Sequence, residues 1–114
     1  MAAPTVGAVV LVRFPFSDLT DSKLRPAAVL ANVGHGDFIL CQITSNHYAD
    51  ATAIELLDEH FRRGGLRRES YIRPGKLFTA NSSLVVREVG ELKVDIRRTI
   101  VQAIDTLLRK DLPR

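Results

Sequence analysis

The sequence contains few of the residues and segments on which several classes of protein depend. It has no tryptophan and a single cysteine, Cys41, which excludes an internal disulfide and a cysteine-based metal site. The apolar neighbours of Cys41 predict a buried, unreactive thiol. No apolar run approaches the roughly 18 residues of a transmembrane helix, and the N-terminus lacks the basic and apolar regions of a signal peptide. We therefore expect a cytoplasmic protein with no membrane segment.

Motifs for metal ions and nucleotide cofactors are also missing. The chain has no G-x-x-x-x-G-K-[ST], G-x-G-x-x-G or H-E-x-x-H motif and no paired Cys/His spacing. The three histidines form no pair at a motif spacing, and only His47, three residues after Thr44, is a candidate for proton transfer. The sequence thus predicts a protein that uses neither a metal ion nor a cofactor.

The charge of the chain is unevenly distributed. Its 114 residues, 46% hydrophobic and 25% charged, predict one domain spanning residues 1–114, with a net charge of +3. Residues 60–76 hold six basic side chains against one acidic one, a local charge of +5, so the remainder carries −2. This segment suits an anionic partner, above all nucleic acid, but a solvated arginine loop fits the same pattern.

Hydrophobic patterning predicts several short strands. Short apolar runs rich in β-branched residues are typical of strands. They cover residues 6–12, 26–33, 38–44, 52–56, 70–73 and 84–89, with residues 76–79 as a short strand or turn. The glycines in Gly34–Asp37 predict a hairpin turn, and Pro74-Gly75 predicts a further turn. Between them, residues 57–68 are expected to form a long irregular connection.

The last segment has the period of an α-helix. Apolar residues from Ile96 to Leu108 recur at steps of three and four, which lines one helix face. Asp95 suits the positive end of the helix dipole and Arg109 the negative end, whereas Lys93 is a poor N-cap. We expect a mainly β fold, a small SH3-like, partly open antiparallel β-barrel with a C-terminal α-helix.

The clearest candidate for chemistry is Arg25. Pro26 fixes its own backbone angle and holds the preceding residue extended, so Arg25 is a firmly mounted cation at the mouth of a strand. A guanidinium can donate two parallel hydrogen bonds to a phosphate, but a salt bridge to Glu55 or Glu88 is an equally ordinary role. Thr44, near the end of the next strand, either joins such a site or bonds only to the backbone.

Further polar residues accompany Arg25 and Thr44. They are Asp18, Asp21, Ser22, Lys23, Ser45, Ser70, Arg73 and Lys76. Such a set suits a phosphodiester of RNA, because the ribose 2′-hydroxyl is the nucleophile and the enzyme need only orient it, transfer protons and stabilise charge on the phosphoryl oxygens.

Three stretches resemble the PemK/MazF-like toxin family of type II toxin–antitoxin systems. They are GAVVLVRFPFSDLTDSKLRPAAVLANV, LCQITS and GGLRRESYIRPGKLFT, which together cover most of the chain. The resemblance implies an SH3-like barrel with a C-terminal helix, usually a homodimer. It also implies a toxin that cleaves single-stranded mRNA sequence-specifically without a metal ion, leaving 2′,3′-cyclic phosphate and 5′-hydroxyl ends.

The same resemblance assigns roles to residues and names partners. It implies that Arg25 and Thr44 are catalytic. It implies RNA contacts by Ser22, Lys23, Ser45, Ser70 and Arg73. The acid and base stay open between Asp18, Asp21 and His47, because a loop glutamate of some branches is missing here. A cognate antitoxin, through which the pair would bind DNA, is expected to place a disordered tail in the same groove.

Two other functions are compatible with a barrel of this type. One is a toxin that poisons DNA gyrase by protein contact alone, which would use the C-terminal helix rather than Arg25. The other is an inactive RNA-binding barrel whose arginines bind phosphates nonspecifically, with a steep dependence on salt.

Overall fold

The structure is a computed structural model, and it describes residues 3–14, 23–46 and 50–113. The described strands are β1 (Ala8–Phe14), β2 (Lys23–Gly34), β3 (Asp37–Thr44), β4 (Ile54–Leu56), β5 (Phe61–Gly64), β6 (Ser70–Asn81) and β7 (Val85–Leu92). Short 3₁₀ turns cover Asp58–His60 and Ser82–Leu84, and the helix α1 spans Val94–Arg109. Four predicted site residues, Asp18, Asp21, Ser22 and His47, lie outside the described residues.

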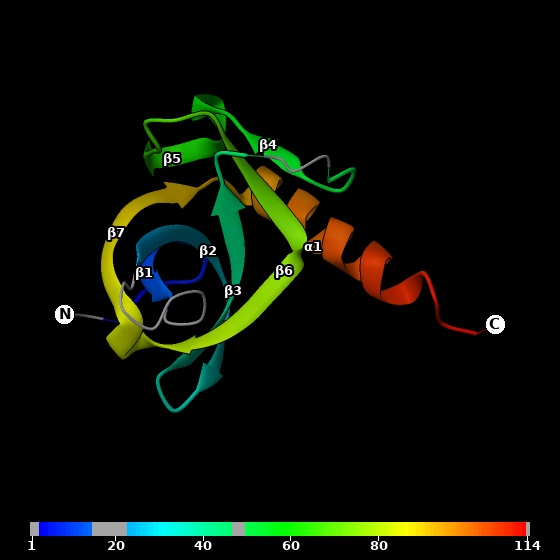
Figure 1. Ribbon diagram of the computed structural model, residues 1–114, viewed down its shortest axis with the longest axis horizontal. Helices are drawn as coiled ribbons and strands as arrows, with labels where there is room; N and C mark the ends of the chain where they lie inside the picture. Colours follow the sequence, from blue (N-terminus) through cyan, green and yellow to red (C-terminus); the bar gives the residue numbers. More distant parts are fainter. Residues whose placement is uncertain (1–2, 15–22, 47–49, 114) are drawn as a thin grey trace.

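The described strands form one antiparallel sheet in the order β4-β6-β3-β2-β1-β7-β5. The sheet curls into a partly closed ring, and α1 lies outside it (Figure 1). Two register shifts between β1 and β7 help the sheet to curl, because an extra residue on one strand bends it and increases its twist. The expected small, partly open antiparallel barrel with a C-terminal helix is confirmed.

Each face of the sheet carries its own apolar cluster. Val10, Val29 and Leu40 belong to the cluster inside the ring, whereas Val9 and Ile43 belong to the cluster that includes α1. Successive side chains of a strand point to opposite faces, so a strand buried on both sides shows an unbroken apolar run. This explains why residues 6–12 read as continuously apolar.

The expected turn at Pro74-Gly75 is wrong, because β6 runs through it without a break from Ser70 to Asn81. The β3–β6 pairing shifts here: Cys41 is opposite Leu77, and Ile43 is opposite Ile72. Four residues of β6 therefore bulge out opposite Gln42. A bulge tolerates proline because its residues need not donate to the neighbouring strand.

The expected irregular connection over residues 57–68 is wrong in part, because it contains β5. Phe61 pairs with Leu92 and Gly64 with Gly90, so β5 forms an edge of the sheet beside β7. Gly64 has a φ of +65°, and a Cβ there would lie 2.2 Å from the Val89 carbonyl oxygen. The strand is short, charged and dependent on a glycine, so its sequence lacks the usual strand pattern.

Candidate active site

A cavity of about 380 Å³ lies at the end of the β2–β3 pair and brings several predicted site residues together. Arg25, Thr44, Ser45 and Ser70 line it, together with two arginines, Arg67 and Arg68. These residues come from β2, β3, the start of β6 and the segment before β6. The curled sheet thus gathers side chains that are up to 45 positions apart in the sequence.

Arg25 reaches the cavity from β2. The β2–β3 ladder pairs Ala27 with Gln42, and continuing it by two residues brings Arg25 opposite Thr44. Both side chains line the cavity, and both residues are half-buried. Glu88, one of the two carboxylates considered as a salt-bridge partner, binds Arg63 at 3.0 Å. Within the described ranges, no ion pair joins Arg25 to an acidic side chain.

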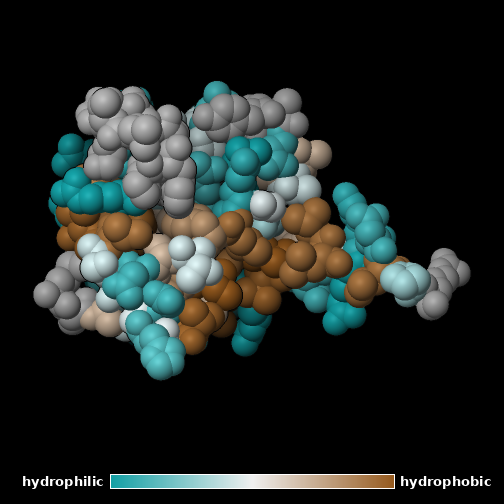
Figure 2. Space-filling view, turned by 60° about the horizontal axis from the view of Figure 1, so that its bottom comes forward, coloured by the Kyte–Doolittle hydropathy of each residue, from teal (hydrophilic) through white to brown (hydrophobic). Residues whose placement is uncertain are grey.

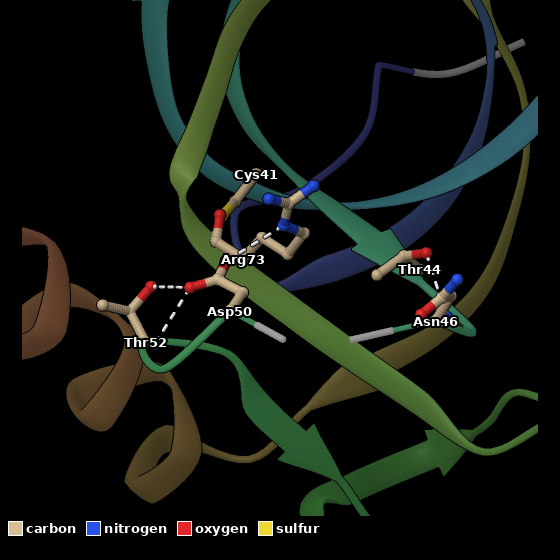
Figure 3. Close-up of polar contacts among 6 residues, drawn as sticks. All are labelled: Cys41, Thr44, Asn46, Asp50, Thr52 and Arg73. Atoms are coloured by element: carbon tan, nitrogen blue, oxygen red, sulfur yellow. Dashed lines mark hydrogen bonds and ion pairs between the residues drawn. The ribbon is translucent and has the colours of Figure 1, made fainter. Parts of the chain in front are cut away.

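A backbone hydrogen bond holds the hydroxyl oxygen of Thr44 in place. Its Oγ1 accepts a hydrogen bond of 3.1 Å from the backbone N–H of Asn46 (Figure 3). A hydroxyl has one proton to donate and two lone pairs, so this bond leaves the Thr44 proton available to a ligand oxygen. Thr44 therefore both bonds to the backbone and lines the cavity.

Ser70 has a different role from the open hydroxyl of Thr44. It is 5% exposed, and its hydroxyl donates to the backbone carbonyl of Arg68 at 2.8 Å. This bond closes the turn that carries Arg67 and Arg68 to the cavity. Ser70 consequently orients the arginine segment, in addition to lining the cavity itself.

Arg73 does not line this cavity. Its Nε lies 3.0 Å from Oδ2 of Asp50, and the two side chains are only 19% and 16% exposed. Asp50 also accepts from the backbone N–H and the hydroxyl of Thr52, at 2.9 and 2.6 Å (Figure 3). The hydrogen bond from the Thr52 hydroxyl is the largest cause, and that from Arg73 the next, of a lowered pKa of about 2 for Asp50. Arg73 thus ties the segment after β3 to β6.

Two further predicted residues lie at the ends of the two central strands that border the site. Ser45 is exposed and follows β3 directly, within the cavity lining. Lys23 is exposed at the start of β2, opposite Phe14, and is not part of the lining.

The structure separates the four arginines that flank Gly64-Gly65 into two pairs. Arg62 and Arg63 bind Glu91 and Glu88 on β7, at distances from 3.0 to 3.8 Å. Arg67 and Arg68, which sequence reasoning treated only as part of a basic loop, line the cavity. The signal in the sequence was Gly64-Gly65, which divides the two pairs and ends β5.

No group of three or more His, Cys, Asp or Glu side chains among the described residues is placed to hold a metal ion. No helix in the described part of the chain is long and apolar enough to cross a membrane.

Solved structures of similar fold cover nearly the whole chain. The MazE-MazF complex (Form-II) from Deinococcus radiodurans has a chain that is 19% identical, with a TM-score of 0.76 over 95% of this chain and 97% of that one. An endoribonuclease from a mycobacterial species is 19% identical, with a TM-score of 0.70 over 99% and 98% of the two chains. The Mycobacterium tuberculosis toxin MazF-mt6 is 18% identical, with a TM-score of 0.69 over 94% and 99%. At these identities the likeness concerns the fold.

The family assignment comes from the sequence match. No curated protein sequence matches the chain. A family model does match, over residues 5–108, and it describes the PemK-like, MazF-like toxin of type II toxin–antitoxin systems. The match spans all the described strands and nearly all of α1. The chain therefore belongs to the PemK-like, MazF-like toxins of type II toxin–antitoxin systems.

Proposed function

We propose that this toxin is a metal-independent, sequence-specific endoribonuclease that acts on single-stranded RNA, chiefly mRNA, in the cytoplasm. The observation that carries the proposal is the presence of Arg25 and Thr44 on one cavity that Arg67 and Arg68 also line. Family membership supports it, as do structural neighbours that are endoribonucleases.

The chemistry requires no nucleophile from the protein. The 2′-hydroxyl oxygen of the substrate forms a bond to the adjacent phosphorus, and the bond from phosphorus to the 5′-oxygen breaks. The products are a 2′,3′-cyclic phosphate and a 5′-hydroxyl. Arg25 neutralises the charge that grows on the phosphoryl oxygens, and the free proton of Thr44 orients one of these oxygens. The base that takes the 2′-proton and the acid that protonates the leaving oxygen come from Asp18, Asp21 or His47.

Two protein partners complete the proposal. Structural neighbours that are MazE-MazF complexes support a cognate antitoxin, which would cover the cavity and block cleavage. Exposed apolar residues support a homodimer: Val94, Val101 and Leu108 of α1 are 52%, 55% and 66% exposed. Figure 2 shows apolar surface that continues from the middle of one face toward the C-terminal end of α1. A sedimentation measurement that finds only monomers at micromolar concentration would refute the dimer.

Cleavage of a long RNA in EDTA by purified protein tests the enzyme. We expect Arg25→Ala and Thr44→Val each to lower kcat by about 10²- to 10³-fold, the usual cost of removing one donor to developing charge. Arg62→Ala is the matched control, because Arg62 is exposed and its nearest carboxylate, Glu91, lies 3.8 Å away, outside the cavity. Cleavage that survives Arg25→Ala undiminished would remove Arg25 from the mechanism.

The same purified protein distinguishes the endoribonuclease from the two alternative functions. Intact RNA together with arrested DNA replication would favour a gyrase poison. RNA binding without any cut would favour an inactive RNA-binding barrel, with affinity that falls steeply as salt rises. Terminal analysis of the fragments, for a cyclic phosphate and a 5′-hydroxyl, identifies the reaction.

A further inference from the structure

A second cavity, of about 270 Å³, adjoins the proposed cleavage cavity. The two share Leu66, Arg67 and Arg68, so this short segment is a common wall. The second volume lies just below the range of about 300–1,000 Å³ that is typical of pockets for drug-sized ligands. It therefore suits one flat heterocycle rather than a larger molecule.

The second cavity combines an apolar floor with a charged rim. Leu56 and Phe61 line it and are only 6% and 8% exposed, and half-buried Leu66 adds to this floor. The exposed charged residues of its lining have both signs: Glu55, Asp58, Arg67, Arg68 and Glu69. A planar base could lie on the apolar floor while its polar edges meet the charges.

Four of these five charged side chains remain available to a ligand. Glu69 is engaged, because the Tyr71 hydroxyl donates to its carboxylate and the bond raises the pKa of Tyr71 to about 12. Among the described residues, no ion pair involves the other four charges. Arg62 and Arg63, by contrast, are paired with carboxylates of β7.

The backbone holds this rim in place from both sides. Glu55 lies on β4 opposite Tyr71 of β6. At one end of the arginine segment, the Gly65 N–H donates to the Val89 carbonyl at 3.1 Å. At its other end, the Ser70 hydroxyl donates to the Arg68 carbonyl. The two guanidiniums are therefore mounted on a short segment that is fixed at both ends.

We propose that this second cavity is a guanine subsite that contributes to the choice of cleavage sequence, and the proposal rests on the function proposed above. Guanine is the base that presents two adjacent donors, N1–H and N2–H, on one edge and two adjacent acceptors, O6 and N7, on another. The carboxylate of Glu55 or Asp58 can accept hydrogen bonds from both N1–H and N2–H. Arg67 or Arg68 can donate to O6 and N7, the commonest specific arginine–base contact. The other arginine stays free for a phosphate at the shared wall.

Binding to RNA that cannot be cut tests the subsite without relying on catalysis. Heptamers of 2′-O-methyluridine lack the nucleophilic 2′-hydroxyl, and one guanine can be placed at each position in turn. We expect one position at which guanine lowers Kd about tenfold or more relative to uridine, measured by fluorescence anisotropy. Inosine, which lacks the N2 amino group, and 7-deazaguanine, which lacks N7, should each lose most of this gain.

Variants of the rim connect the preference to named side chains. The preference for guanine over inosine should vanish in the double variant Glu55→Gln, Asp58→Asn. The preference for guanine over 7-deazaguanine should vanish in the double variant Arg67→Gln, Arg68→Gln. Glu59→Gln is the matched control, because Glu59 is an exposed neighbour in the same 3₁₀ turn that lines neither cavity.

The outcomes distinguish the subsite from the enzyme. Equal binding of guanine and uridine at every position, or a guanine preference that survives in both double variants, would overturn the subsite. Heptamers with ordinary ribose test cleavage separately. Guanine preference without cleavage would overturn the proposed function alone, and cleavage without guanine preference would overturn the subsite alone.

Discussion

Two arginines to which the family resemblance assigns roles in RNA cleavage or binding, Arg25 and Arg73, lie in different surroundings. Arg25 lines the proposed cleavage cavity, whereas Arg73 pairs with Asp50. We therefore expect a substitution of Arg73 to act through its ion pair with Asp50 rather than through contact with a ligand in that cavity.

Acid should weaken the fold through Asp50. The pKa of Asp50 is about 2 in the folded protein, below its ordinary value of 3.8, so the charged form is favoured by folding. This contribution is fully present above about pH 4 and is lost as the pH falls toward 2. Arg73→Gln should lower the free energy of unfolding at pH 7 by about 1.5–3 kcal/mol, the usual range for a hydrogen bond to a charged group.

Urea unfolding at pH 7, 4 and 2.5 measures this effect. The difference between wild type and Arg73→Gln should shrink toward the lowest pH, because Asp50 is then partly protonated in both. Arg109→Gln is the control, since its ion pair with Asp105 is exposed and worth little. A difference that is the same at all three pH values would contradict the assignment to Asp50.

The strand β5 is the element on which the proposed guanine subsite most depends. It carries Phe61 into the apolar floor, and its last residue, Gly64, packs directly on the backbone of β7. The contact between Gly64 and the backbone of β7 therefore holds both the sheet edge at β5 and the start of the arginine segment that follows it.

Alanine substitutions at two glycines separate this contact from backbone strain. Gly64 and Gly34 both have positive φ, +65° and +91°, but a Cβ at Gly34 meets nothing within 4 Å. Gly34→Ala should cost only the strain of the left-handed conformation, about 1–2 kcal/mol. Gly64→Ala should cost more, because its Cβ must also displace the Val89 carbonyl. Thermal unfolding compares the two, and an equal cost would show that β5 does not pack as described.

Only some of the basic side chains of the molecule are placed to bind an anionic ligand. The net charge of +3 does not show which cations face a ligand, and the +5 segment contains both paired and cavity-lining arginines. Electrostatic binding to RNA depends on the cations that reach phosphates.

Salt dependence of RNA binding distinguishes the two arginine pairs. Each phosphate contact contributes about −0.7 to the slope of log K against log salt for single strands. Arg67→Gln, Arg68→Gln should make that slope less negative by about 0.7 if one arginine binds a phosphate and the other a base. Arg62→Gln, Arg63→Gln should leave the slope nearly unchanged. Fluorescence anisotropy between 50 and 300 mM salt measures both slopes. A larger change of slope in the Arg62, Arg63 variant than in the Arg67, Arg68 variant would contradict the assignment of Arg67 and Arg68 to the ligand.

Two patterns that depend on neighbours along the chain, the hairpin and the C-terminal helix, were predicted correctly. The hairpin at Gly34–Asp37 follows from residues that adopt positive φ: Gly34, His35 and Gly36. The helix Val94–Arg109 follows from its apolar period, and its lack of a side-chain N-cap at Lys93 was also expected. Motif order in the sequence was enough to indicate the family, which the family model then confirmed.

Other features depended on partners far away in the sequence. Pro74-Gly75 reads locally as a turn, but pairing with β3 holds it in a strand as a bulge. Four similar arginines became two different pairs, because only Arg62 and Arg63 lie beside carboxylates of β7. The sequence by itself thus determined the Gly34–Asp37 hairpin, the C-terminal helix and the family, which depend on backbone preferences, hydrophobic period and residue order. The tertiary structure alone decided which charges are neutralised and which face the cavities, because strand register sets those distances.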